Sequence, residues 1–207
     1  EKMYLQAEKK YSKNDKYLTH GIDLYKYLNK HEKRISKTLE IIKIKGLNKI
    51  FGTILISSQM YLNNWSQKDF REFQKGFSKI FKPYDAKEIT KVDIDKGKIK
   101  VGFLSPDFNK DHSITYFIKG LLKELKQTEF ETFGLSLLKD NQHDESTDKL
   151  LLLFDNWVVL GKKTDQEIIN IIQDLKIDVL IDLGGLWSYS RISIFNTRIC
   201  PLQISWL

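Results

Sequence analysis

The sequence is poor in the residues and patterns that mark several large protein classes. Its 207 residues include a single cysteine, Cys200, which cannot form a disulfide within the chain and favours a reducing, cytoplasmic location. No apolar run approaches the ~18 residues that a membrane-spanning helix needs. The best candidate, DVLIDLGG, is interrupted by Asp182. We therefore expect a cytoplasmic protein with no membrane among its partners.

The motifs of cofactor and metal enzymes are missing as well. The first predicted strand runs into GFLSPDFNKDHS, not into the G-x-G-x-x-G of a dinucleotide-binding turn, and no phosphate loop ending in Gly-Lys-Ser/Thr occurs. No Cys/His group has zinc spacing, and the histidines are far apart in sequence. They are His20, His31, His112 and His143. We therefore expect no cofactor and no metal.

Positive charge is concentrated in the first half of the chain. Residues 1–97 contain 21 Lys/Arg and 12 Asp/Glu, a net charge of +9, whereas residues 98–207 contain 13 and 15, a net charge of −2. Because the lysines are scattered singly among acids and aromatics, the pattern favours a solvated helical surface over a nucleic-acid interface. Nucleic acid is not expected among the partners.

Apolar residues recur at spacings of three and four up to residue 82, which predicts helices. One helix is predicted after Ser66, which can form a capping box with Asp69, and Pro83 marks its end. Another apolar face is formed by Ile35, Leu39 and Ile42. We interpret residues 1–50 as a helical extension, for which tetratricopeptide-like hairpins are an unproven alternative, and residues 51–97 as a helical lead-in and linker.

From residue 98 the apolar period changes to short β-rich runs separated by helical patterns. Helices are predicted over residues 113–126, 164–176 and 190–198, and NQHDEST is interpreted as a solvated loop. Strands are predicted to begin near Ile99, Phe130, Trp157, Val179 and Leu202. Strands that alternate with helices indicate an α/β fold with a Rossmann-like parallel sheet and right-handed crossovers. We expect this domain to span residues 98–207.

Polar residues and glycines follow two of the predicted strands. They are Ser105, Asp107 and His112 after the first strand, and Asp182, Gly184 and Gly185 after the fourth. In a parallel sheet both loops face one crevice, where ligands bind. Other roles stay open: Asp107 can cap the following turn, Asp182 fits a structural hydrogen-bonding role better than chemistry, and the glycines can simply make a tight turn.

Two stretches resemble the catalytic region of the O-GlcNAc transferase family. KVGFLSPDFNKDHSITYF is similar to the family pattern V-G-Y-V-S-P-D-F followed by H-S-V-x-Y-F. IIQDLKIDVLIDLGGLWSYSRISIFNTRICPLQISWL is similar to the later block I-D-I-L-V-D-L-x-G-H-T, N-R and P-x-Q-V-x-W-L. MYLNNWSQKDFREFQKGF resembles the helix that precedes the catalytic lobe. The resemblance covers residues 51–207, with the motifs in the family's order.

The resemblance implies the first lobe of a two-lobed GT-B glycosyltransferase that inverts the sugar and needs no metal. It implies a nucleotide-sugar donor, commonly UDP-GlcNAc and gripped mainly by the second lobe, and acceptor Ser or Thr of intracellular proteins or peptides. His112 matches the family's active-site histidine, after a one-residue insertion within NKD. We expect His112 and Asp107 to be catalytic. The expected substrate-binding residues are Ser105, Pro106, Asp182, Gly184 and Gly185.

The sequence departs from the family at two places. Leu186 and Trp187 stand where D-L-x-G-H-T has His and Thr, so the acceptor or sugar preference can differ. The sequence stops after Trp206 and Leu207, where G-Y-P-G-T and the second lobe would follow, so we expect a fragment that is inactive alone. Two alternatives stay open: a relative with a fucose or glucose donor, and a non-catalytic protein-binding helical module fused to a degenerate lobe.

Overall fold

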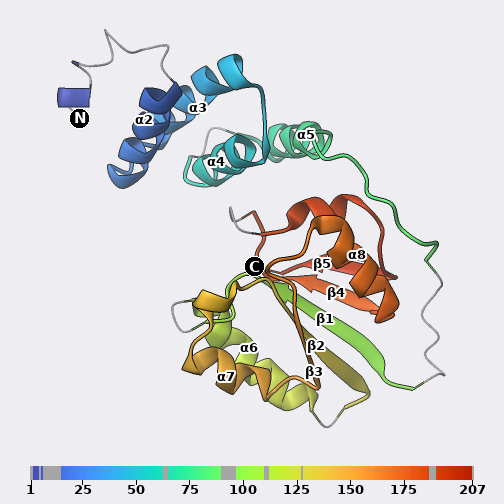
Figure 1. Cartoon of the computed structure of the whole chain (residues 1–207). Coiled ribbons are helices and arrows are strands. Elements are labelled where there is room, and N and C mark those ends of the chain that lie inside the picture. Colours follow the sequence, from blue (N-terminus) through green and yellow to red (C-terminus); the bar gives the residue numbers. More distant parts are fainter. Residues whose placement is uncertain are drawn as a thin grey trace. The chain divides into compact units, whose positions relative to one another are not determined.

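The computed structural model describes residues 2–4, 6, 15–62, 65–89, 97–109, 112–126, 128–186 and 190–206. The chain forms two compact units, Glu1–Lys82 and Pro83–Leu207. The first unit is helical and the second is built around a β-sheet (Figure 1). Within the described part of the chain, every helix is too short or too polar to cross a lipid bilayer.

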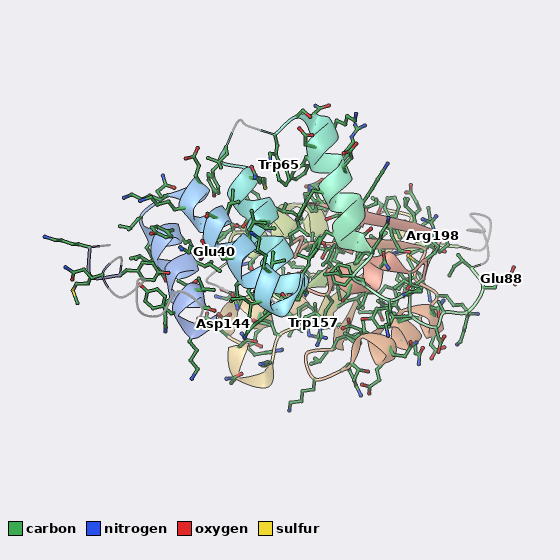
Figure 2. All side chains as sticks on the ribbon, turned by 90° about the horizontal axis from the view of Figure 1, so that it is seen from above. Glu40, Trp65, Glu88, Asp144, Trp157 and Arg198 are labelled. Carbon is green, nitrogen blue, oxygen red and sulfur yellow. The ribbon has the colours of Figure 1, made fainter. Side chains whose placement is uncertain are left out.

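The first unit is a series of helices joined by short turns. They are α2 (Asp15–Tyr27), α3 (His31–Lys45), α4 (Lys49–Gln59) and α5 (Gln67–Ser78). The predicted capping box is confirmed, because Ser66 Oγ accepts from the Asp69 N–H at 3.2 Å and Asp69 Oδ2 accepts from the Ser66 N–H at 3.0 Å. Trp65, labelled in Figure 2, lies just before α5, with its ring centroid 5.3 Å from that of Phe73.

Helix α3 lies where the spacing of Ile35, Leu39 and Ile42 predicts a helix. Its buried side chains are Arg34, Thr38 and Ile41, whereas Leu39 is 45% exposed. Two polar groups of this buried face have partners: Arg34 Nη1 donates to Ser58 Oγ of α4 at 3.1 Å, and Thr38 Oγ1 donates to the Arg34 carbonyl at 2.8 Å. Apolar periodicity misses such a face, because paired polar side chains can be buried too.

The second unit contains a five-stranded sheet whose strand pairs are all parallel, in the order β3-β2-β1-β4-β5. The strands are β1 (Ile99–Ser105), β2 (Phe130–Ser136), β3 (Asn156–Val159), β4 (Val179–Asp182) and β5 (Leu202–Ser205). Four begin at the predicted residue, and β3 begins one residue earlier than predicted. The α/β prediction with a parallel, Rossmann-like sheet is confirmed.

Helices cover both faces of this sheet. Figure 1 shows α6 (Ser113–Leu125) and α7 (Glu145–Leu151) on one face and α8 (Asp165–Asp174) on the other. Alternate residues of β1 point to the two cores: Val101 and Phe103 pack with α6 and α7, and Leu104 packs with α8. The residues of β1 from Val101 to Ser105 are all buried, as expected for a central strand covered on both sides.

Two short helical segments differ from the sequence-based prediction. Part of NQHDEST, interpreted as a solvated loop, belongs to α7, which Asp144 caps by accepting from the N–H groups of Ser146 and Thr147 at 2.9 and 3.0 Å. A seven-residue helix shows too few turns for apolar periodicity to reveal it. The helix predicted over 190–198 is a short 3₁₀ segment, η3 (Ile192–Asn196); a further 3₁₀ turn is η2 (Asp140–Gln142).

The residues that enter the second unit pack along α8. Tyr84 donates its hydroxyl to Asp165 Oδ2 at 2.6 Å. Gln166 and Gln173 then each pair an amide with the backbone of this segment: they accept from the N–H groups of Asp85 and Lys87 and donate to the carbonyls of the same two residues. The segment from Pro83 is thus bound to the sheet unit by alternating backbone contacts.

Candidate functional site

The predicted polar loops lie where the strand order of the sheet reverses. From β1 the chain continues to β2 and β3 on one side, then crosses over so that β4 and β5 lie on the other side. The carboxyl ends of β1 and β4 therefore flank the topological switch point, where open α/β sheets bind ligands. Leu104 pairs with Asp182 in the register of these strands, so the loops that follow begin side by side.

The loop after β1 brings Asp107 and His112 together. Ser105 and Pro106 are buried, and Ser105 Oγ accepts from the Asp107 backbone N–H at 3.0 Å. His112 is the N-cap of α6, where its Nδ1 accepts from the Ile114 N–H at 3.5 Å. Its Nε2 lies 3.7 Å from Asp107 Oδ2. The loop thus places an imidazole and a carboxyl group side by side.

The surroundings of the Asp107–His112 pair suit a polar ligand. Because Nδ1 accepts a backbone hydrogen bond, the proton of a neutral imidazole sits on Nε2, facing the carboxylate. Burial raises the pKa of the Asp107 carboxyl above its ordinary value, and the charge of His112 partly opposes this rise. The His112 side chain is 38% exposed and that of Asp107 14%. A ligand at this edge meets an N–H donor beside a carboxyl group.

Asp182, at the end of β4, is instead engaged by its own loop. The residue is 1% exposed. Its Oδ1 accepts from the Gly184 N–H at 3.1 Å, and its Oδ2 accepts from the Gly185 N–H at 2.9 Å and from Ser205 Oγ at 3.2 Å. These bonds fold the turn that leaves the strand. Asp182 thus shapes the edge of the crevice through its backbone partners.

Gly184 brings the two loops into contact. A Cβ at this position would lie 2.9 Å from Ser190 Cβ and 3.1 Å from Pro106 Cδ, closer than side chains normally approach. Gly185 has a φ of +50°, in the left-handed region that favours glycine. All the predicted site residues therefore lie at one edge of the sheet. Of the two departures from the family pattern, Leu186 is partly buried, and Trp187 lies outside the described residues.

Known proteins match both the sequence and this geometry, although no protein-family model matches the chain. The chain is similar to the probable UDP-N-acetylglucosamine–peptide N-acetylglucosaminyltransferases SPINDLY of Hordeum vulgare (25% identical over 139 residues, 66% of this chain) and Arabidopsis thaliana (27% over 111 residues, 53% of this chain). A solved mutant O-GlcNAc transferase of Thermobaculum terrenum superposes with a TM-score of 0.80 at 21% identity. The chain is similar to the O-GlcNAc transferases in sequence and in fold.

The chain matches only a small part of the length of each relative. It spans 14% of the length of the barley relative and 12% of the Arabidopsis one. The match to the solved transferase covers 93% of this chain and 37% of that chain, and at this identity it shows the fold alone. The solved transferase therefore contains the fold of this chain, whereas the activity of the whole protein is a matter for proposal.

Sequence reasoning missed two threonines that hold the loop of the candidate site. Thr115 donates its hydroxyl to the carbonyls of Asp107 and Asn109 at 3.2 and 2.7 Å. Thr147 donates to the carbonyl of Phe108 at 2.7 Å. The signal for Thr115 was its place three residues after a helix-capping residue, where a side chain reaches back to the preceding loop. No sequence signal links Thr147 to a loop 39 residues earlier.

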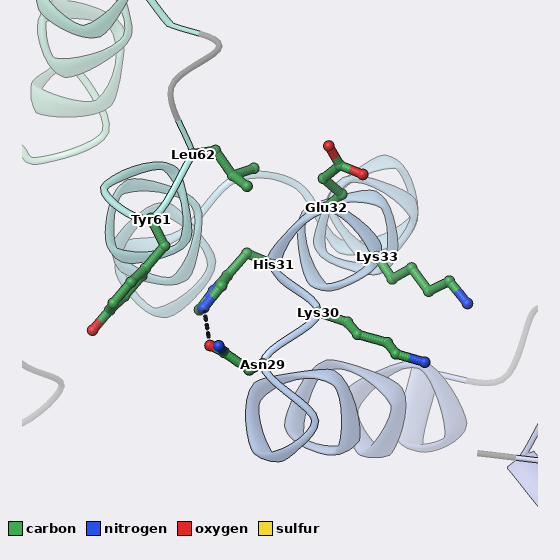
Figure 3. Close-up of a pocket in the computed structure, with 7 residues that line it drawn as sticks. All are labelled: Asn29, Lys30, His31, Glu32, Lys33, Tyr61 and Leu62. Carbon is green, nitrogen blue, oxygen red and sulfur yellow. Dashed lines mark hydrogen bonds between the residues drawn. The ribbon is translucent and has the colours of Figure 1, made fainter.

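A second concave surface lies in the helical unit and contains none of the predicted site residues. This cavity of about 400 Å³ lies at the α2–α3 turn. In Figure 3 the His31 ring lies between Asn29 and Tyr61: its Nε2 is 2.7 Å from Asn29 Oδ1, and it stacks on Tyr61 with a centroid separation of 4.3 Å. Lys30 and Lys33 point away from this stack in the same view. The lining groups therefore do not converge on one ligand position.

The described residues contain no group of three or more His, Cys, Asp or Glu side chains placed to hold a metal ion. Among the described side chains, those that this edge of the sheet offers to a ligand are the Asp107–His112 pair, together with backbone groups. Such a set can bind and orient a hydroxyl group through hydrogen bonds.

Proposed function

We propose that this chain is the acceptor-side lobe of a protein glycosyltransferase. The whole enzyme transfers a sugar, GlcNAc from UDP-GlcNAc, to Ser or Thr hydroxyls of cytoplasmic proteins with inversion at the sugar. The observation that carries this proposal is that a chain similar to named N-acetylglucosaminyltransferases has Asp107 and His112 together at the switch point of its sheet.

In an inverting transfer the acceptor oxygen bonds to the anomeric carbon while the bond to the nucleotide diphosphate breaks. The diphosphate leaves with the bonding electrons, and the hydroxyl gives up its proton to a general base. His112 suits the binding of the acceptor oxygen, since its Nε2 carries the proton in the tautomer that caps α6. Asp107 then holds the imidazole through its charge, at 3.7 Å from Nε2.

The remaining predicted residues shape the acceptor site in this proposal. Pro106 and Gly184 form the contact between the two loops. Ser105 and Asp182 accept backbone N–H groups and hold the two turns in place. A nucleotide sugar would find no glycine-rich phosphate turn at the end of β1, so we assign most of the donor binding to a part of the enzyme outside this lobe.

The test is a transfer assay with the complete enzyme, purified with its natural flanking sequence. Labelled UDP-GlcNAc, UDP-glucose and a fucose nucleotide are each supplied with a cytoplasmic protein extract and with a Ser/Thr-rich peptide. We expect label on protein from UDP-GlcNAc. Label from the fucose or glucose donor alone would replace the donor in the proposal. A folded enzyme that transfers from none of the three donors would contradict it and favour a binding module.

A further inference from the structure

The backbone after β1 is held by hydroxyl groups from two helices. Residues 107–109 leave the sheet, so their carbonyl groups cannot be paired by strand neighbours, and buried carbonyl groups need donors. Three successive carbonyl oxygens here accept from threonine side chains. Thr147 Oγ1 donates to Phe108 at 2.7 Å, and Thr115 Oγ1 shares its one proton between Asn109 at 2.7 Å and Asp107 at 3.2 Å.

Thr115 connects the two members of the candidate pair. It is 1% exposed and lies in the first turn of α6, three residues after His112. The hydroxyl therefore ties the helix that begins at His112 to the backbone of Asp107 itself. A backbone bond from the His112 N–H to the Asn109 carbonyl, at 3.4 Å, is longer than the bond from Thr115 to the same oxygen.

Thr147 fixes the middle of this segment from α7. The residue is 0% exposed, and its hydroxyl reaches the carbonyl of Phe108. The Phe108 ring is itself fully buried, with centroids 5.7 Å from Phe154 and 5.3 Å from Trp157. Phe108 is thus anchored through both its side chain and its backbone, and Asp107 is its direct neighbour.

We propose that Thr115 and Thr147 are positioning residues that set the distance between the Asp107 carboxylate and the His112 imidazole. The importance of that distance for transfer rests on the function proposed above, whereas the positioning itself does not. Neither hydroxyl touches the crevice; each acts through the backbone of residues 107–109. Removing a hydroxyl therefore changes the pair's geometry while the pair's own side chains stay intact.

The test compares Thr147→Val, which keeps the shape and removes the hydroxyl, with Thr147→Ser, which keeps the hydroxyl. In the 207-residue protein, the ring proton shifts of His112 are followed by NMR from pH 4 to pH 9. We expect the His112 titration to change in Thr147→Val and to match the wild type in Thr147→Ser. In the complete enzyme we expect kcat to fall about 10-fold or more for Thr147→Val, with KM for the nucleotide sugar unchanged.

Asp144→Ala is the matched control. Thr147 also belongs to the cap of α7, where its hydroxyl accepts from the Asp144 N–H at 3.2 Å. Asp144→Ala removes the carboxylate that accepts from the N–H groups of Ser146 and Thr147, but it leaves the bond from Thr147 to Phe108. We expect the His112 titration of this variant to match the wild type. An equal change in Asp144→Ala and Thr147→Val would overturn the proposal, since the effect would then come from the stability of α7.

Thr115→Val is the second variant, with Thr115→Ser as its partner. A wild-type His112 titration in both folded valine variants would also overturn the proposal. If neither valine variant folds, the wild type decides: we expect the Thr147 hydroxyl proton to exchange slowly with water, and a rapidly exchanging proton would contradict the bond. If the titration changes as expected but the enzyme transfers no sugar from any donor, the positioning stands and the proposed function fails.

Discussion

Two aspartates follow neighbouring strands at the same edge of the sheet, yet their surroundings differ. Asp182 ends β4 with a buried carboxylate that accepts from Gly184, Gly185 and Ser205. Asp107 follows β1 with its carboxylate facing His112 at 3.7 Å. The first carboxylate is engaged by the turn that it closes, whereas the second is free to meet a ligand. For a carboxylate at the edge of a parallel sheet, the hydrogen-bond donors that already surround it indicate its role better than its position in the sequence does.

The comparison predicts that Asp182 is needed for folding. Asp182→Ala leaves two partly buried N–H groups and an exposed hydroxyl without the carboxylate that they donate to, at a cost of about 3 kcal/mol in the free energy of unfolding of the sheet unit. Urea denaturation of the 207-residue protein measures this loss. Asp174→Ala, which removes an exposed carboxylate paired with Lys87, should change the free energy by less than about 0.5 kcal/mol. Equal losses in the two variants would contradict the assignment.

The sheet could be predicted from sequence because its signals are local. Each strand is a short β-rich run. Thr164 and Glu167 predict the start of α8 through a capping box, which the structure confirms. The crevice followed from the parallel topology, which puts the ends of β1 and β4 together. The resemblance to the transferases then assigned the chemistry to His112, a step that spacing alone did not support.

Features that depend on distant partners escaped prediction. The buried Arg34 of α3 is acceptable only because Ser58 of α4 lies opposite it. The Thr147 bond to Phe108 joins residues that only the packed fold brings together. The division of labour between Asp107 and Asp182 is of the same kind, since it depends on which N–H groups and side chains surround each carboxylate. The roles of the predicted site residues stay predictions until they are tested.

A second prediction concerns His112 in the complete enzyme. His112→Asn keeps a side chain that caps helices well, so the melting temperature should change little. The donor on Nε2 and the partner of Asp107 are lost, so transfer should fall by about 10²-fold, or roughly 2.7 kcal/mol in activation free energy. Steady-state kinetics measures the effect. The matched control is His143→Asn, at the end of η2 and not among the predicted site residues, which should retain wild-type transfer. A stable His112→Asn enzyme with wild-type turnover would make His112 only a helix cap.

The smallest predicted effect separates Asp107 from an aspartate whose carboxylate is well paired. Asp165 accepts from Tyr84 at 2.6 Å, Arg191 at 2.6 Å and Ser193 at 2.7 Å. Burial alone would raise the pKa of Asp165, but these hydrogen bonds and the charge of Arg191 outweigh it and lower the pKa. The pKa of Asp107 is raised, chiefly by burial. The two carboxylates should therefore give the stability of the protein opposite dependences on pH.

The direction in which stability changes with pH follows from how many protons the folded and the unfolded states bind. With a raised pKa, folded Asp107 holds its proton to a higher pH than the unfolded chain does, so wild-type stability declines between the unfolded and the folded pKa. Asp107→Asn removes this decline, and its stability relative to wild type should rise by less than about 1 kcal/mol across that window and then stay constant. Asp165→Asn should behave oppositely: its stability relative to wild type should fall as pH rises from the lowered folded pKa to the unfolded one. Urea denaturation at a series of pH values measures both differences, and slopes of the same sign would show that Asp107, like Asp165, is held by structural bonds.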